Sequence, residues 1–186
     1  MRTLRFAIER LTDCHPSLFL ESHTVACVAL MSSHSVSPCS FEVECENIRS
    51  TWLGRARRFG FNVSWSPQTE AKAERLRSTV QVNTLVEMAA VAVALALAHS
   101  ILDPGQLDVT AMGARADYRS LEAGVVLEVS GTREPSELKR RQRAKVAQAL
   151  ANTFGWNAYV VVCLFAPQAS RVHFSYHQTT TGSIHG

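Results

Sequence analysis

The chain has 186 residues, of which 46% are hydrophobic and 19% charged, and its formal net charge is +3. This length and composition fit one globular domain that buries a full core. The small excess of basic residues is compatible with a nucleic-acid partner, but it is too small to identify one.

The five cysteines argue against a disulfide-stabilised fold, because their number is odd and none of them forms a C-x-x-C pair. They are Cys14, Cys27, Cys39, Cys45 and Cys163. The charged N-terminus, with Arg2 and Arg5, lacks the apolar stretch of a signal peptide. We therefore expect a cytoplasmic protein with reduced thiols.

Residues 1–66 have the pattern of short strands separated by turns. The predicted strands are residues 4–10, 23–31, 41–48 and 59–65. A segment rich in Ser, Pro and His at residues 32–40 separates the second strand from the third. No internal repeat divides the chain, so we expect this part to belong to the same domain as the rest.

A helical pattern begins at Pro67 and continues to Leu102, where Asp103-Pro104-Gly105 should end it. The apolar spacing along one face is set by Ala71, Leu76, Val80 and Leu85. Residues 88–98 are apolar but too few to span a bilayer. The sequence therefore predicts a buried core helix and no membrane partner.

The rest of the core is predicted as a strand pair, a helix and two further strands. The pair is 107–119, bent at Gly113, and 125–131. The helix begins near Glu134-Pro135 and runs through Ala151, and the last strands are 159–166 and 171–178. Residues 179–186 have the composition of a flexible tail.

A β-α-β crossover follows from this order, with strands 125–130 and 159–165 parallel and helix 136–151 between them. We therefore predict an α/β (α+β) fold: a single domain with a mixed sheet, this crossover and flanking helices. Its core spans residues 67–178.

Two acids lie on the adjacent predicted strands, Asp117 on the first and Glu128 on the second. Val126, Glu128 and Ser130 would share one face of their strand. A buried carboxylate costs several kcal/mol unless something pairs with it, whether an arginine, a metal ion or a substrate.

This arrangement resembles the restriction-endonuclease-like superfamily, named PD-(D/E)XK after its weak signature. The resemblance covers the order of elements over residues 67–178, and it implies a nuclease-like core. It makes Asp117 and Glu128 the metal ligands and catalytic acids, and Mg²⁺ the cofactor of phosphodiester cleavage. Members of the family also often carry an acid on a helix near the site, and the resemblance implies that Glu87 could take this position.

The chain departs from that signature at two positions. Ser130 stands where the family has its lysine, and Ala116 where it has proline. We expect Lys139, near the start of the next helix, to supply the catalytic lysine, and Lys145, further along, to be less well placed. Carboxylates about 4 Å apart repel by about 4 kcal/mol at an effective dielectric near 20, so the pair needs a cation or a proton.

The predicted helix carries the densest positive run of the chain, which is a candidate for contacts with nucleic-acid phosphates. These candidates are Arg133, Arg140, Arg141, Arg143 and Lys145. Such a run is also typical of a solvated helix face. His173 and His177 would share a strand face, but they lack the spacing of a zinc motif.

Three readings therefore stay open. The first is a metal-dependent nuclease. The second is a catalytically inactive nuclease-like fold or another non-catalytic α/β module. In that case the acids would form a structural ion pair with Arg115, Arg119 or a helix arginine. The basic helix would then bind a protein or nucleic-acid partner. The third is an assembly module whose apolar helix 85–102 packs against a second copy to form a homo-oligomer.

Overall fold

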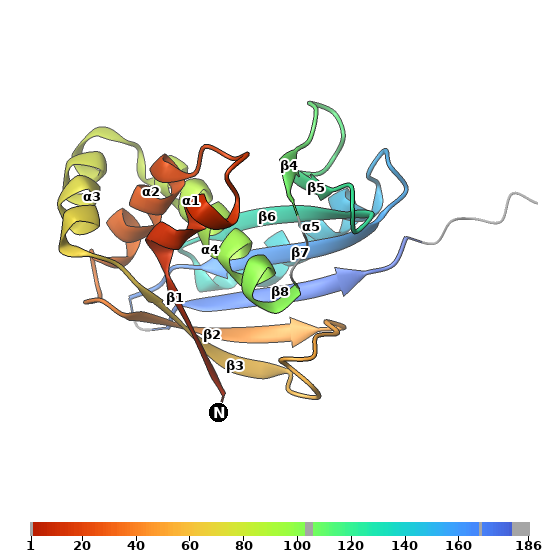
Figure 1. Cartoon of the computed structure of the whole chain (residues 1–186), viewed down its shortest axis with the longest axis horizontal. Coiled ribbons are helices and arrows are strands. Elements are labelled where there is room, and N and C mark those ends of the chain that lie inside the picture. Colours follow the sequence, from red (N-terminus) through yellow and green to blue (C-terminus); the bar gives the residue numbers. More distant parts are fainter. Residues whose placement is uncertain (1, 103–105, 168, 180–186) are drawn as a thin grey trace, which may run out of the picture.

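The computed structural model describes residues 2–102, 106–167 and 169–179 (Figure 1). Its strands are β1 (Thr3–Ala7), β2 (Cys39–Glu46), β3 (Arg58–Ser64), β4 (Asp108–Val109), β5 (Tyr118–Ser120), β6 (Val125–Thr132), β7 (Asn157–Leu164) and β8 (Arg171–His177). Its helices are α1 (Leu11–Cys14), α2 (Glu21–Met31), α3 (Pro67–Thr79), α4 (Val82–Leu102) and α5 (Leu138–Leu150), with 3-10 turns at Ile8–Arg10 and Pro135–Glu137.

All strands form one mixed eight-stranded sheet in the order β1-β3-β2-β8-β7-β6-β5-β4. β2 pairs parallel with β8, so strands from the first 66 residues and strands from the rest of the chain share the sheet. The predicted mixed α/β architecture is confirmed.

The predicted crossover is also confirmed, because β6 and β7 are parallel over their whole length, from Val125 opposite Asn157 to Thr132 opposite Leu164. α5 connects them and packs on both. Both strands are buried and rich in β-branched residues, which is typical of parallel strands covered on both faces.

Helices cover the two faces of the sheet unequally. α2, α3 and α4 lie on one side, while α5 lies behind β6 and β7 on the other (Figure 1). On β6, Leu127 and Val129 join the core beneath α4, and Val126 joins the smaller core beneath α5. Glu128 shares a face with Val126, so it points toward α5.

α4 is the central core helix. Twelve of its residues are buried, and it packs against α2, β6 and β7. Among the described residues it is the one helix long and apolar enough to cross a membrane, a property that buried core helices share. The apolar face of α4 is covered by other elements of the same chain. It is therefore not exposed for packing against a second copy, contrary to what the sequence suggested.

The prediction of a strand at 23–31 is wrong, because this segment is the helix α2. Every residue from Thr24 to Met31 is buried. A segment enclosed on all sides shows neither the period of an amphipathic helix nor that of a half-exposed strand. Its run of Val, Ala and Cys therefore did not reveal its type.

The predicted continuous helix 67–102 is also two helices. Ser66 caps α3 by accepting a hydrogen bond from the N–H of Thr69, and Pro67 occupies the first turn. α3 ends at Thr79, and Val80 is extended with φ −115° and ψ 139°. Residues 103–105, predicted to stop α4, lie outside the described residues.

The predicted bent strand 107–119 is two short strands, β4 and β5, separated by a turn in which Gly113 has φ +89°. β5 pairs with β6 only from Ser120 opposite Val125 to Tyr118 opposite Leu127. The later part of β6 therefore has no strand beside it on this side. Of the predicted tail, residues 180–186 lie outside the described residues.

The five cysteines are free thiols, and all except Cys14 are buried. Burial raises the pKa of Cys45 to about 12, with a smaller contribution from Glu44, so this thiol stays protonated at neutral pH. The cysteines thus behave as small apolar side chains.

Gly131 allows the close contact between β6 and α4. A Cβ atom there would lie 2.6 Å from the carbonyl oxygen of Val86 and 3.0 Å from Cβ of Ala90. We expect Gly131→Ala to lower the free energy of unfolding by about 1–3 kcal/mol, because the helix must move away from the strand. Urea unfolding measures the change. Thr84→Ala, on the exposed side of α4, should change it by less than about 0.5 kcal/mol, and a neutral Gly131→Ala would contradict this packing.

Candidate functional site

The site lies along the edge of β6 that β5 leaves without a strand partner. Two carboxylates occupy this edge in place of a strand. Asp117 Oδ2 accepts a hydrogen bond from the N–H of Val129 at 2.8 Å. Glu87 Oε2, from α4, accepts one from the N–H of Gly131 at 3.4 Å. The acids therefore cap backbone donors that would otherwise be exposed at the sheet edge.

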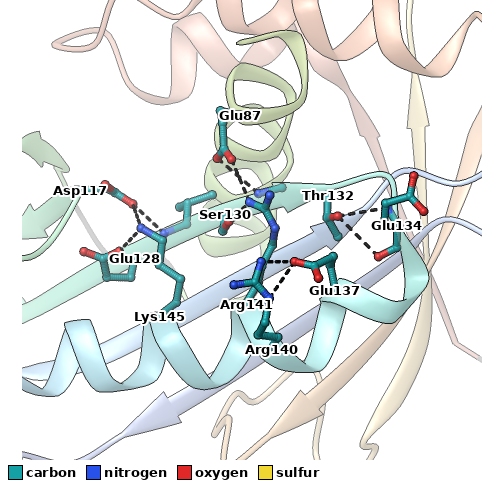
Figure 2. Close-up of polar contacts among 12 residues, drawn as sticks. Glu87, Asp117, Glu128, Ser130, Thr132, Glu134, Glu137, Arg140, Arg141 and Lys145 are labelled. Carbon is teal, nitrogen blue, oxygen red and sulfur yellow. Dashed lines mark hydrogen bonds and ion pairs between the residues drawn. The ribbon is translucent and has the colours of Figure 1, made fainter. Parts of the chain in front are cut away.

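Glu128 and Asp117 converge on one lysine from α5 (Figure 2). Lys145 Nζ lies 2.6 Å from Glu128 Oε2 and 3.7 Å from Asp117 Oδ2. Gln148, one turn further along α5, donates to Glu128 Oε1 at 2.8 Å. The side chain of Glu128 is 0% exposed, so both of its oxygens are satisfied within the protein.

The pKa values of this pair show how the charges balance. Burial raises the pKa of Glu128 to about 7, the hydrogen bond from Lys145 lowers it in part, and the charge of Asp117 raises it further. Burial lowers the pKa of Lys145, but its hydrogen bond to Glu128 and the nearby acids outweigh this, so it lies above its usual value. The lysine therefore stays a cation and is not a general base at neutral pH.

A second ion pair continues the row beside the first. Arg141 Nη1 donates to Glu87 Oε1 at 3.2 Å and to the Oγ of Ser130 at 3.1 Å. Acids from α4, β6 and the residue before β5 thus alternate with two cations from α5 (Figure 2). The sequence signal for Glu87 was an acid inside a helix rich in Ala, Val and Leu.

The structure places Lys145, and not Lys139, between the two acids. Lys139 is exposed, and in the described part of the chain it forms no ion pair with Asp117 or Glu128. The reason is helical periodicity: Arg141, Lys145 and Gln148 recur at intervals of three to four and share the face toward the sheet. The prediction of Lys139 was wrong because it considered only how near each lysine lies to the start of the helix, and not which face of the helix it occupies.

The other predicted cations divide into two groups. Arg141 and Lys145 are engaged in the site, while Arg140 is 71% exposed and pairs with Glu137 of the 3-10 turn that precedes α5. Arg133 and Arg143 are exposed, with no ion pair among the residues that the structure describes. The basic run is therefore partly structural and partly free at the surface.

The predicted arginine partners of the acids are not the ones found. Arg115 is exposed and adopts a positive φ of 55°. Arg119 lies over the ring of Phe154, with its Cζ 5.5 Å from the ring centroid. An ion pair does form, but its cation is Lys145.

The acid pair does not fit a divalent cation as it stands. Proteins usually hold Mg²⁺ with one or two carboxylates, and waters complete its octahedral shell. Here the ammonium of Lys145 occupies the space between the two carboxylates that such an ion would need. Within residues 2–102, 106–167 and 169–179, no three His, Cys, Asp or Glu side chains are grouped so that they could hold a metal ion. His173, which with His177 lacks the spacing of a zinc motif, has its Nε2 atom 3.4 Å from Oε2 of Glu46 and also contacts the side-chain amide of Gln142 in α5.

Cavities open on both sides of this row. One of about 410 Å³ is lined by Thr110, Met112, Arg115, Asp117 and Gln148. Another of about 410 Å³ is lined by Asn83, Glu87, Thr132, Arg133 and Arg141. Asp117 is 38% exposed, so solvent reaches this acid although Glu128 is enclosed.

Comparisons of the chain with protein-family models, with curated proteins and with solved structures find no match. Function is therefore inferred from the geometry of this site and the surface around it.

Glu128 should make the protein less stable as the pH rises. Its pKa lies above the usual 4.5, so the folded state binds this proton more tightly than the unfolded state does. The stabilisation is full below about pH 4.5 and is lost as the pH rises through about 7, by up to about 3 kcal/mol.

Glu128→Gln removes the titratable carboxyl, so comparing this variant with wild type separates the effect of Glu128 from that of the histidines, which titrate in the same pH range. We expect the difference in unfolding free energy, wild type minus Glu128→Gln, to fall by up to about 3 kcal/mol between pH 4.5 and pH 7.5. Urea titrations across this range measure it. Parallel curves for the two proteins would show that the carboxyl of Glu128 is not held in its protonated form.

Proposed function

We propose that this chain is a catalytically inactive nuclease-like domain that binds nucleic acid through the exposed basic side of α5. The observation that carries the proposal is the position of Lys145 Nζ, 2.6 Å from Glu128 and 3.7 Å from Asp117. The charge that a metal ion would bring to this acid pair is supplied by the protein's own lysine.

Exchange of this lysine for a metal ion would be unfavourable. Breaking a buried ion pair by removing one partner costs about 3–5 kcal/mol, because a charge is left unpaired away from water. Glu128 is fully enclosed and also holds Gln148, so moving it toward a metal would break two hydrogen bonds. The acids are therefore better suited to hold α5 on β6 than to bind Mg²⁺.

The free cations lie on the opposite side of α5. Lys139 and Arg143 are four residues apart and share the solvent side of the helix. Both are exposed, and neither has an ion pair in the described part of the chain; Arg133, before the helix, adds a third such cation. Exposed Lys and Arg on one helix face supply the sequence-independent part of nucleic-acid affinity.

This basic surface is confined to α5 and the segment before it. The same face of the sheet carries Glu42, Glu44 and Glu46 on β2, which are exposed. Arg58 and Arg171 pair with these acids at 3.0 and 3.6 Å. The sheet therefore offers no continuous positive path beyond α5.

An active metal-dependent nuclease is the second candidate. It is favoured by the convergence of Asp117 and Glu128 on one point and by the exposure of Asp117 beside a cavity. In that case Lys145 would have to leave its position when the metal ion binds. Cation uptake therefore separates the two candidates.

The first experiment removes the lysine that occupies the acid pair. At pH 8, we expect wild-type protein to take up no Mg²⁺ or Mn²⁺ in calorimetry and to leave single- and double-stranded DNA and RNA intact. Lys145→Ala should gain Mn²⁺ uptake, because two carboxylates then lack a counter-charge. Lys139→Ala, which removes an exposed lysine of the same helix, should gain none.

Circular dichroism should establish that Lys145→Ala is folded before its cation uptake is interpreted. Wild-type protein that cleaves DNA or RNA with Mg²⁺, and that loses this activity in Glu128→Gln, would contradict an inactive domain and support the nuclease.

The second experiment tests the basic surface. The double variant Lys139→Glu/Arg143→Glu should bind a duplex oligonucleotide at least about 10-fold more weakly at moderate salt. The slope of log K against log salt should fall by about 2, one for each lost phosphate contact. Fluorescence anisotropy over a salt series measures both quantities.

The matched control is Arg55→Glu/Arg57→Glu, which makes the same charge change at exposed residues between β2 and β3. It should leave the slope unchanged. An equal loss in both double variants would assign the binding to net charge, and undetectable binding by wild-type protein would exclude a nucleic-acid partner.

A further inference from the structure

An apolar groove lies on the other side of the sheet from α5, between α3 and the segment that precedes α2. Its cavity measures about 830 Å³ and is lined by Pro16, Leu18, Leu20, Val25 and Leu76. This groove, defined by those five residues, is separate from the acid pair and from the basic side of α5. Its use is therefore independent of the function proposed above.

Phe19 stands at the rim of the groove with its side chain 99% exposed. Its neighbours Leu18 and Leu20 are 8% and 2% exposed, so they take the two inward positions of the segment. The ring of Phe19 is thereby directed away from its own core. The other large apolar side chains that are exposed in the described part of the chain are Val, Met or Leu, so Phe19 is the aromatic residue of this group. The exposed ring of Phe19 and the adjoining groove together form a contiguous apolar patch, and such patches are typical of contact surfaces.

The two rims of the groove carry opposite charges. Glu21 lies on the α2 rim, and Lys72 and Arg75 lie on the α3 rim. Glu21 and Lys72 form an ion pair at 2.7 Å, with side chains 75% and 62% exposed. Arg75, one turn further along α3, is exposed and has no ion pair within the part of the chain that the structure describes.

We propose that this groove is the interface of a homodimer in which a second copy inserts its Phe19. A twofold interface uses the same patch on both subunits, so the patch must be complementary to itself. This patch meets that requirement, because it carries an aromatic side chain, an apolar cavity and both signs of charge.

A twofold axis running along the groove places the α2 rim of one copy opposite the α3 rim of the other. In this arrangement each Phe19 would enter the partner's groove, and each Glu21 would face the basic α3 rim of the partner, where Arg75 has no ion pair among the described residues. A phenyl ring buries about 150–250 Å² on insertion, and two such rings form the centre of an interface whose rim is charged.

Sedimentation over a concentration series tests the dimer. We expect wild-type protein to be mostly dimeric at about 100 μM, which corresponds to a dissociation constant of about 10 μM or lower. Phe19→Ser should raise the dissociation constant at least about 100-fold, because two rings lose their burial. Met112→Ser, which replaces another fully exposed apolar side chain in the loop before β5, should leave it unchanged. A monomeric wild type, or a Phe19→Ser protein as dimeric as wild type, would overturn the proposal.

The predicted charge contacts allow a sharper test of the twofold arrangement. Glu21→Arg and Arg75→Glu, each alone, should weaken the dimer because like charges then face each other at both contacts. An equimolar mixture of the two variants should dimerise again, since both contacts in the mixed dimer pair opposite charges. Both residues are exposed, and loss of the surface ion pair between Glu21 and Lys72 should lower the free energy of unfolding by no more than about 1 kcal/mol, so both variants should fold. A mixture that stays as monomeric as its components would overturn this arrangement.

Discussion

The contact between the ammonium of Lys145 and the enclosed carboxyl of Glu128 is the polar constraint on how α5 packs against the sheet, and an apolar cluster around Val126 and Ala149 surrounds it. Glu128 lies in the middle of a buried strand, where an unpaired charge would be unfavourable by several kcal/mol. The ammonium and the amide of Gln148 together satisfy it. Because both come from α5, the same contacts that satisfy the charge fix this helix in register on β6 and β7.

The second constraint is the short length of β5, which leaves part of β6 without a neighbouring strand. Exposed strand edges invite pairing with other chains, and natural proteins cover them with charged side chains. Asp117 and Glu87 do this here by accepting hydrogen bonds from the N–H groups of Val129 and Gly131. Asp117 and Glu128, which the sequence led us to expect as metal ligands, thus cap a strand and neutralise a lysine.

The two faces of the sheet divide the proposed roles of the protein. On one face, α5 directs Lys145 inward and Lys139 and Arg143 outward, so one helix stabilises the core and presents a basic surface. On the other face, α4 is covered by α2 and by the sheet, and Phe19 stands fully exposed beside the apolar groove. A dimer formed through that groove would leave the basic sides of both α5 helices accessible.

The sequence by itself determined the elements whose pattern is local. The β6–α5–β7 unit followed from two apolar β-rich runs around a helix that begins after a proline. Glu128 was correctly located on a strand, while Asp117, expected on the neighbouring strand, lies one residue before β5. Only the tertiary structure decided the identity of α2, which lost its periodicity by being buried on all sides, and the choice of Lys145 over Lys139. Which lysine reaches an acid depends on the rotation of α5 about its axis, and packing against the sheet sets that rotation.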